Sequence, residues 1–127
     1  MDKLFVGERA ERFGDAALNI THVQVNEVHI LSVCGHIDSA TVCNLDEAIA
    51  TVVEQLPRRV VIDLTEVDFI GVTGASLLLA ARQRLGGGNR VVVVAPVGHI
   101  VERPFRLLDV WHEVPVYRTL WAAMERR

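Results

Sequence analysis

Three side chains close together in the sequence have the types that nucleophilic catalysis uses. His36, Asp38 and Ser39 lie within four residues of one another, and a serine, a histidine and a carboxylate can act as nucleophile, base and orienting group. Their geometry would depend on one short loop, and the sequence offers no second loop with donors for an oxyanion. Asp38 and Ser39 are also preferred helix N-caps. We therefore favour a helix cap beside a surface histidine, and predict no enzymatic activity and no catalytic residue.

A second group lies between residues 71 and 76, where a Gly-containing turn follows an apolar run and precedes a helix pattern. Free backbone N–H groups and the helix dipole make a helix N-terminus favourable for negative charge. Such a site suits a phosphoryl group or an acidic side chain of a partner. Thr73 is placed to cap this helix with its hydroxyl.

Cys34 and Cys43 are the only cysteines, and their spacing fits neither a disulfide scaffold nor a CxxC metal pattern. A redox pair between them would need Cα atoms within about 7 Å. Cys34 alternates with Ser32 on a predicted strand, and Cys43 lies off the apolar stripe of the following helix, so the two can face different directions. Two independent small side chains are favoured, with a reversible disulfide as the alternative.

Metal and cofactor sites are not indicated. The remaining histidines have no ligand spacing and are interpreted as surface or strand-face residues. The glycines at 86–88 follow a predicted helix, which favours a C-cap and turn over a phosphate cradle. The histidines in question are His22, His29, His99 and His112.

Composition limits the class of protein. The 127 residues are 50% hydrophobic with a net charge of −3, which predicts one folded domain and gives no basic surface for nucleic acid. No apolar run approaches the roughly 20 residues that span a bilayer, and the first eight residues turn acidic too early for a secretory signal. We expect a cytoplasmic protein with a protein partner, without nucleic acid or membrane.

The elements that position these residues follow from periodicity and turn signals. Residues 1–17 are expected to be a partly ordered leader that packs on the body or on a second subunit, so a homodimer is left open, and residues 18–127 form the domain. Apolar residues at three- and four-residue spacing predict helices, and short apolar runs predict strands. Strands are predicted at 18–25, 28–35, 60–64, 90–95 and 114–116, and helices at 42–56, 75–85, 98–108 and 117–126. This order predicts an α/β fold with a mixed, mostly parallel sheet of about five strands and about four helices.

The run VVIDLTEVDFIGVTGASLLL at residues 60–79 resembles the signature of the STAS domain of bacterial anti-sigma factor antagonists. In that family a strand reading V-x-D-L-x-x-V is followed by F-[IM]-D-S-[ST]-G-[LI] and an apolar helix. GHID at 35–38 is similar to the family's G-x-[LI]-D, and FRLLDV at 105–110 to its L-x-x-[ST]-G-[LI], with Asp109 where Gly is usual. The resemblance runs from about Ile20 to Met124 and implies the STAS fold.

The resemblance implies a function through protein contact. Members bind the kinase-like domain of an anti-sigma factor and so release a sigma factor, until the partner phosphorylates the Ser of the signature and expels them. Gly71 and Val72 replace the Asp-Ser pair, so the usual switch is expected to be absent. Thr73 is the nearest hydroxyl and a candidate phosphoacceptor, although the N-cap role is favoured. The implied partner-binding residues are Gly71, Val72, Thr73, Gly74, Ser76, Asp38 and Ser39.

Three alternatives are weighed against this interpretation. A structural or sensory STAS module of a larger signalling complex would not need a phosphoacceptor, and a third reading is small-molecule or nucleotide binding at the same helix start. A bacterial receiver domain has a similar element order but needs paired carboxylates after an early strand and a lysine after a late one. Lys3 is the only lysine in the chain, which argues against a receiver.

Overall fold

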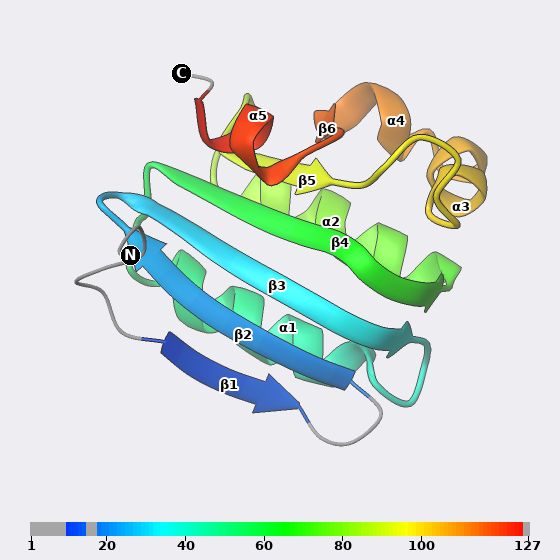
Figure 1. Cartoon of the computed structure of the whole chain (residues 1–127), viewed down its shortest axis with the longest axis horizontal. Helices are drawn as coiled ribbons and strands as arrows, with labels where there is room; N and C mark the ends of the chain where they lie inside the picture. The colour runs from blue at the N-terminus through cyan, green and yellow to red at the C-terminus, as the bar shows by residue number, and fades with distance from the viewer. Residues whose placement is uncertain (1–9, 15–17, 126–127) are drawn as a thin grey trace.

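The described residues form a single sheet of six strands, in which strands that are neighbours in sequence are neighbours in space (Figure 1). The computed structural model describes residues 10–14 and 18–125. The strands are β1 (Ala10–Gly14), β2 (Leu18–Val25), β3 (Val28–Ile37), β4 (Arg59–Ile70), β5 (Val91–Val94) and β6 (Val116–Tyr117). The helices are α1 (Val42–Val53), α2 (Val72–Arg84), α3 (Glu102–Leu107), α4 (Val110–Glu113) and α5 (Leu120–Glu125).

The sheet is mixed, as its order of connections requires. β1, β2 and β3 are antiparallel, whereas β3, β4, β5 and β6 are parallel and are joined through helices. The predicted hairpin is confirmed: β2 and β3 turn at Asn26 and Glu27, and Asn26 takes a φ of 57°, which asparagine tolerates better than most residues. The predicted α/β fold with a mostly parallel mixed sheet is therefore confirmed.

Each face of the sheet buries a different set of apolar side chains. One face packs against α1, α2 and α3 through side chains such as Leu31, Ile62, Leu45, Leu78 and Phe105. In the part of the chain that the structure describes, the helix on the opposite face is α5, which lies in front of the sheet while α1 and α2 lie behind it in Figure 1. β4 contributes side chains to both clusters, so it is buried on both faces. This explains why the run of residues at its start is almost entirely apolar.

Several boundaries differ from the predicted ones. β4 continues to Ile70, and α2 begins at Val72, three residues before the predicted start. The predicted helix at 98–108 is divided into α3 and α4, and Pro104 lies in the first turn of α3, where no intrahelical partner for its nitrogen is needed. β1 pairs with β2 over five residues, so part of the predicted leader adds a sixth strand at the sheet edge. Residues 1–9 and 15–17 lie outside the described residues.

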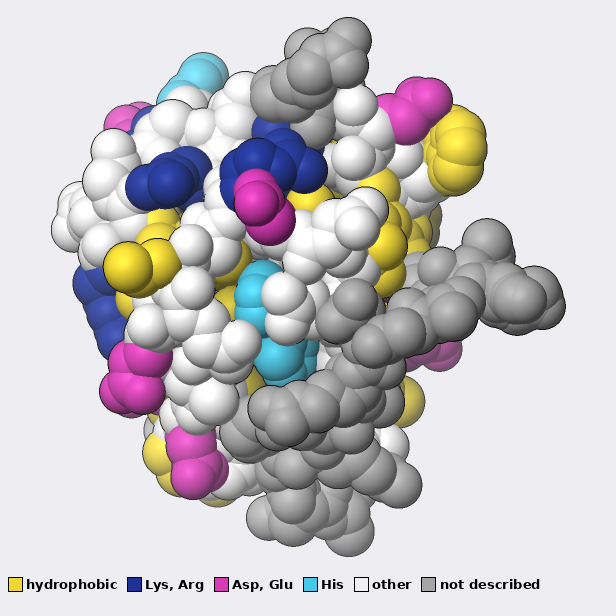
Figure 2. All heavy atoms as spheres, turned by 90° about the vertical axis from the view of Figure 1, so that its left-hand side faces the viewer, with side chains coloured by type: hydrophobic (Ala, Val, Ile, Leu, Met, Phe, Trp, Pro, Cys, Tyr) yellow, Lys and Arg dark blue, Asp and Glu magenta, His cyan; other side chains and the backbone are white. Residues whose placement is uncertain are grey.

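The end of the molecule where β4 and β5 begin is basic. Arg58, Arg59, Asn89 and Arg90 line a hollow of about 420 Å³ there, and basic side chains gather on this end in Figure 2. Arg59 donates to the carbonyl of Ala123 in α5 over 2.9 Å, and Arg90 to that of Leu85 at the end of α2 over 3.3 Å. Helix C-termini favour cations, so these arginines stabilise the fold.

Among the described residues, no helix has both the length and the apolar character that a membrane crossing requires.

Candidate functional site

The carboxyl ends of β3 and β4 fix the start of α2. The two strands run in parallel with Ile37 opposite Ile70, and the backbone N–H of Gly71 donates to the carbonyl of Ile37 over 2.9 Å. The chain enters α2 directly after this hydrogen bond. The helix start is therefore held against the end of the neighbouring strand, and not on a free loop.

Gly74 allows α2 to approach the sheet this closely. A Cβ at position 74 would lie 2.7 Å from Cγ2 of Ile37 and 2.9 Å from Cγ1 of Ile70, both shorter than a carbon–carbon contact allows. Gly74 is buried. It supports the surface from beneath and offers a partner no side chain.

The cap of α2 differs from the predicted one. Gly71 is the N-cap, in an extended conformation with φ −89° and ψ −178°, and no side chain bonds to the free N–H groups of the first turn. The prediction that Thr73 caps the helix was wrong, because Thr73 already lies inside the helix, where its hydroxyl is exposed. Ser76, one turn further, is exposed too. The helix start thus presents two hydroxyls and uncapped backbone donors to the surroundings.

An exposed apolar surface surrounds this helix start. We call it the α2–α3 surface and define it by Phe69, Val72, Ile100 and Leu107, which are 49%, 52%, 45% and 69% exposed. The four side chains line a hollow of about 280 Å³ between the end of β4 and helix α3. Contiguous exposed apolar side chains with a polar rim are typical of protein contact sites.

Sequence reasoning found Val72 but missed the other three members of this surface. Phe69 was quoted only as part of a strand motif, and Ile100 and Leu107 were assigned to the apolar face of a helix. The apolar residues from Phe69 to Val72 did indicate an exposed apolar side chain. Successive side chains of a strand point to opposite faces, so one of them would be exposed at the end of the strand. The contribution of α3 has no local signal in the sequence.

The loop after β3 is fixed by the side chains of Asp38 and Thr41. Oδ1 of Asp38 accepts hydrogen bonds from the backbone N–H groups of Ala40 (2.9 Å) and Thr41 (3.1 Å), and the Thr41 hydroxyl donates to the carbonyl of His36 over 2.7 Å. α1 begins only at Val42, with Thr41 as its N-cap residue. Asp38 therefore caps the turn that leads into the helix, and Ser39 is exposed beside it.

The residue types of a triad do not come together as one. Nδ1 of His36 lies 2.5 Å from Oδ1 of Asp68 on β4, whereas the carboxylate of Asp38 accepts the hydrogen bonds of its own loop. Asp68 also lines the hollow beside Phe69. His36 is thus tied to the rim of the α2–α3 surface, and its carboxylate partner is Asp68 and not the Asp38 of its own loop.

Both cysteines are free and exposed. Val33 and Ile37 of β3 pack into the cluster that includes α1, so Cys34, which alternates with them, faces the other side of the sheet. Cys43 lies on α1. The structure thus contains no disulfide between them, and their opposite placement argues against the redox pair considered from the sequence. Within the described residues no three His, Cys, Asp or Glu side chains are grouped as metal ligands.

These features define a class of protein: an α/β domain that presents a helix start, framed by exposed apolar side chains, at the carboxyl end of a mostly parallel sheet. The chain belongs to the STAS domain family, whose model matches residues 19–123. The family resemblance noted in the sequence is therefore confirmed.

Relatives of known name agree with this assignment. The chain is 34% identical over 108 residues to the anti-sigma-F factor antagonist RsfB of Mycobacterium tuberculosis, covering 85% of this chain and 88% of that protein. A crystal structure of an anti-sigma factor antagonist from Mycobacterium paratuberculosis matches with 34% identity, a TM-score of 0.79 and coverage of 85% and 92%. The unphosphorylated form of the anti-sigma factor antagonist SpoIIAA matches with a TM-score of 0.67 over 94% and 95% of the two chains. At 16% identity this match supports the fold alone.

Proposed function

We infer that this chain is an anti-sigma factor antagonist, which binds an anti-sigma factor and thereby releases a sigma factor. The observation that carries the inference is the α2–α3 surface at the start of α2, on a chain 34% identical to named antagonists over most of its length. An apolar surface of this kind stabilises a complex when a partner removes it from water.

We propose that binding is centred on Val72. Its side chain is 52% exposed and lines the same hollow as Phe69 and α3, while Thr73 and Ser76 provide exposed hydroxyls on the same helix. Asp38 and Ser39 extend the contact along the loop that follows Ile37, the residue bonded to Gly71. Gly71 and Gly74 contribute through the backbone, the first as N-cap and the second by close packing.

The regulation we propose differs from a serine phosphorylation switch. Val72 occupies the position where the family signature has its Ser, and a valine has no group that accepts a phosphoryl. Thr73 is the nearest exposed hydroxyl and the only candidate we consider at the helix start for modification by the partner. A phosphate there would add about −1.5 to −2 charges beside an apolar surface and oppose binding.

Two other roles are compatible with the same surface: a sensory STAS module within a larger complex, and nucleotide or small-molecule binding at the uncapped helix start. We favour the antagonist because the exposed side chains around the helix start are apolar, which suits a protein surface better than a phosphate. We propose that the protein acts without catalysis, in the cytoplasm, on a protein partner and neither nucleic acid nor membrane.

The test is a pair of matched substitutions. The partner is captured from the source organism with the parent protein, identified, and produced separately, and its dissociation constant is measured by calorimetry. Val72→Asp places an uncompensated carboxylate in the contact and should weaken binding by at least about 100-fold, since burying an unpaired charge costs several kcal/mol. Leu56→Asp is the control, because Leu56 is 83% exposed and follows α1 at the opposite end of the sheet.

The functional readout is transcription in vitro with sigma factor and anti-sigma factor present. The parent protein and Leu56→Asp should restore transcription, and Val72→Asp should not. If the captured partner is not an anti-sigma factor, or if no transcription returns with the parent protein, the antagonist role is wrong. If Val72→Asp behaves like the parent, the contact lies on another face.

A further inference from the structure

We propose that the partner-binding surface continues along α3 and recognises an acidic residue of the partner through Arg103. This proposal rests on the antagonist function inferred above and adds the chemistry of the partner segment. The segment should carry apolar side chains that fill the α2–α3 surface, and a carboxylate that pairs with the Arg103 guanidinium.

Two hollows meet along α3. The first lies between the end of β4 and α3, and the second, of about 480 Å³, lies along the outer side of α3. Ile100, Arg103 and Leu107 line both of them. Because Arg103 lines the first hollow together with Val72, a partner that covers Val72 also reaches Arg103. We call the two hollows together the trough.

Arg103 is the cation left unpaired in this trough. It is exposed, and no hydrogen bond or ion pair joins it to any residue in the part of the chain that the structure describes. Asp68, at the other rim of the first hollow, is paired with His36. The unpaired charge that α3 presents to a partner is positive, and a carboxylate is its complement.

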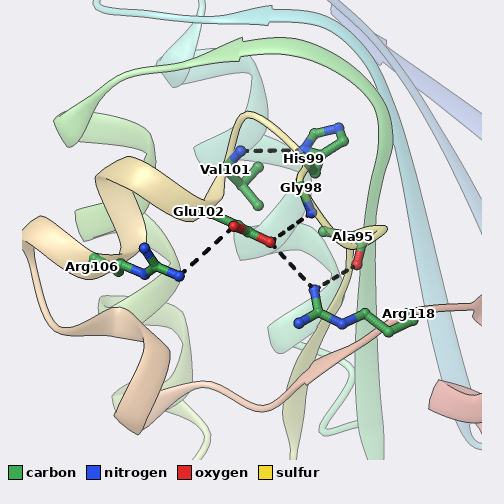
Figure 3. A network of polar contacts seen from close by, with 7 residues as sticks. All are labelled: Ala95, Gly98, His99, Val101, Glu102, Arg106 and Arg118. Atoms are coloured by element: carbon green, nitrogen blue, oxygen red, sulfur yellow. Dashed lines mark hydrogen bonds and ion pairs between the residues drawn. The ribbon is translucent and has the colours of Figure 1, made fainter.

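The acidic side chain nearest to this cation in the sequence, Glu102, is already engaged. Its Oε2 accepts from the backbone N–H of Gly98 over 2.7 Å and lies 3.9 Å from Nη1 of Arg118, while its Oε1 lies 3.9 Å from Nη2 of Arg106. Figure 3 shows the Glu102 carboxylate held between these groups, with Arg118 in turn donating to the carbonyl of Ala95. Glu102 is therefore engaged by these other groups and makes no ion pair with Arg103.

The contacts of Glu102 also hold α3, which lines the trough, against the rest of the domain. Glu102 ties the first turn of α3 to the loop that follows β5 and, through Arg118, to the segment before α5. These contacts fix α3, which carries Arg103 and Leu107, and the turn before it, which carries Ile100. Arg103 itself is outside the network, so its replacement should leave the network unchanged.

The experiment measures binding of the anti-sigma factor isolated with the parent protein. Arg103→Gln should weaken binding about tenfold and Arg103→Glu considerably more, and both should flatten the dependence of affinity on salt, since a charge pair at an interface is screened by ions. Arg58→Glu makes the same change of charge at the opposite, basic end of the molecule and should bind like the parent. Thermal unfolding of the Arg103 variants should be unchanged within about 2 °C, because that side chain is exposed and makes no ion pair with the residues that the structure describes. Arg58→Glu also removes an exposed ion pair with Glu27, which contributes little to stability because both side chains are in water, so this control should remain folded.

A second step identifies the carboxylate. Arg103→Glu should regain most of the parent affinity with a partner variant in which one surface Asp or Glu near the contact is replaced by Arg. If Arg103→Glu binds within about twofold of the parent while Val72→Asp does not bind, α3 is no part of the contact and the proposal is overturned, with the antagonist function intact. If Arg103→Glu and Arg58→Glu weaken binding equally, the effect is one of net charge and the proposal is also overturned. If the parent binds no anti-sigma factor, both inferences fail.

Discussion

Val72 and Gly74 lie two residues apart at the start of α2 and have opposite surroundings. The valine is half exposed on the surface, whereas the glycine contacts Ile37 and Ile70 beneath it. A change at position 72 should therefore alter recognition with little effect on stability, and a change at position 74 should alter stability first. This difference lets the two roles be separated by substitution.

Gly74→Ser should destabilise the protein. Serine is the better helix former by about 0.5 kcal/mol, but its Cβ would lie 2.7 Å and 2.9 Å from two buried isoleucines, and overpacking of this kind costs about 1–3 kcal/mol. We expect a net loss of about 1–2 kcal/mol in urea unfolding. Gly71→Ser is the control, because a Cβ there has no neighbour closer than 3.7 Å and serine is a good N-cap. Equal stability of the two variants would contradict the packing argument.

Thr73 is the candidate phosphoacceptor at the start of α2. Incubation with ATP and the kinase-like partner should leave most of the protein unmodified, because Val72 has no hydroxyl, as intact-mass spectrometry would show. Stoichiometric phosphate on Thr73 would falsify this prediction. In that event Thr73→Ala should abolish labelling, and Thr73→Glu should weaken partner binding, because its carboxylate carries part of the same charge.

At the scale of the elements, the sequence predicted what local patterns determine. Apolar alternation and the Asn26–Glu27 turn predicted the β2–β3 hairpin, and the apolar run from Val60 predicted the start of β4, as the structure shows. The end of β4 and the start of α2 were misplaced because the turn at Gly71 is tighter than the glycines suggested. Gly71 bonds to the end of β3, and that tertiary contact has no sequence pattern.

The candidate site was predictable only in its contiguous part. Val72, Thr73 and Ser76 follow one another in the chain, and the family signature marks them. Ile100 and Leu107 join the surface because α3 packs beside α2, and the division between α3 and α4 at Asp109, which has a φ of 60°, sets how that helix lies. Apolar periodicity assigned these two side chains to a core face, since it cannot tell a buried stripe from one left open for a partner.

The pairing of β2 with β3 contains a pH-dependent contact. His22 and His29 are 4% and 2% exposed, and Nε2 of His22 lies 2.8 Å from Nδ1 of His29 with the rings stacked. Burial and, to a lesser extent, His22 lower the pKa of His29 below 6.5. Between that lowered pKa and 6.5 the unfolded state binds more protons than the folded state, so stability rises with pH.

Above pH 6.5 we expect the contribution of neutral His29 to the free energy of unfolding to be fully present. This contribution should be lost as the pH falls through the lowered pKa of His29. Denaturant unfolding at a series of pH values from neutral to mildly acidic measures this slope. The double variant His22→Leu/His29→Leu removes both partners, so no imidazole is left unpaired in this contact, and its slope should be shallower. His112→Asn, which changes an exposed histidine, should keep the slope of the parent. A slope unchanged in the double variant would contradict the assignment.

At the scale of the whole molecule, the two ends of the parallel strands have different roles. The amino ends of β4 and β5 carry arginines that meet helix carbonyls. The carboxyl ends of β3 and β4 carry the start of α2 and, through α3, the apolar surface. In open α/β sheets the carboxyl ends of strands are where helices start, so backbone donors and loops gather there. The contacts that stabilise the fold at the amino ends of the strands are thus separated by the sheet from the surface at the carboxyl ends, which we propose binds the anti-sigma factor.

Strand β1 forms the edge of the sheet furthest from α3. β1 pairs with β2 along five residues, from Ala10 opposite Val23 to Gly14 opposite Asn19, and without it β2 would be an open edge with free N–H and C=O groups. Deletion of residues 1–14 should lower stability by roughly 1–3 kcal/mol through the lost hydrogen bonds, and should increase self-association, because an open edge pairs with other strands. Chemical unfolding and sedimentation measure the two effects.

Deletion of residues 1–9 is the matched control, since it keeps the β1 ladder and should match the full chain in both measurements. Affinity for the anti-sigma factor should stay within about twofold of the parent in either truncation, because the α2–α3 surface belongs to β4, α2 and α3. If the longer deletion leaves stability and association unchanged, β1 adds nothing to the domain, and the boundary predicted between residues 17 and 18 is the correct one. If it abolishes partner binding in a protein that still folds, the leader belongs to the functional surface. The proposal that binding is confined to the carboxyl ends of β3 and β4, away from the β1 edge, would then be wrong.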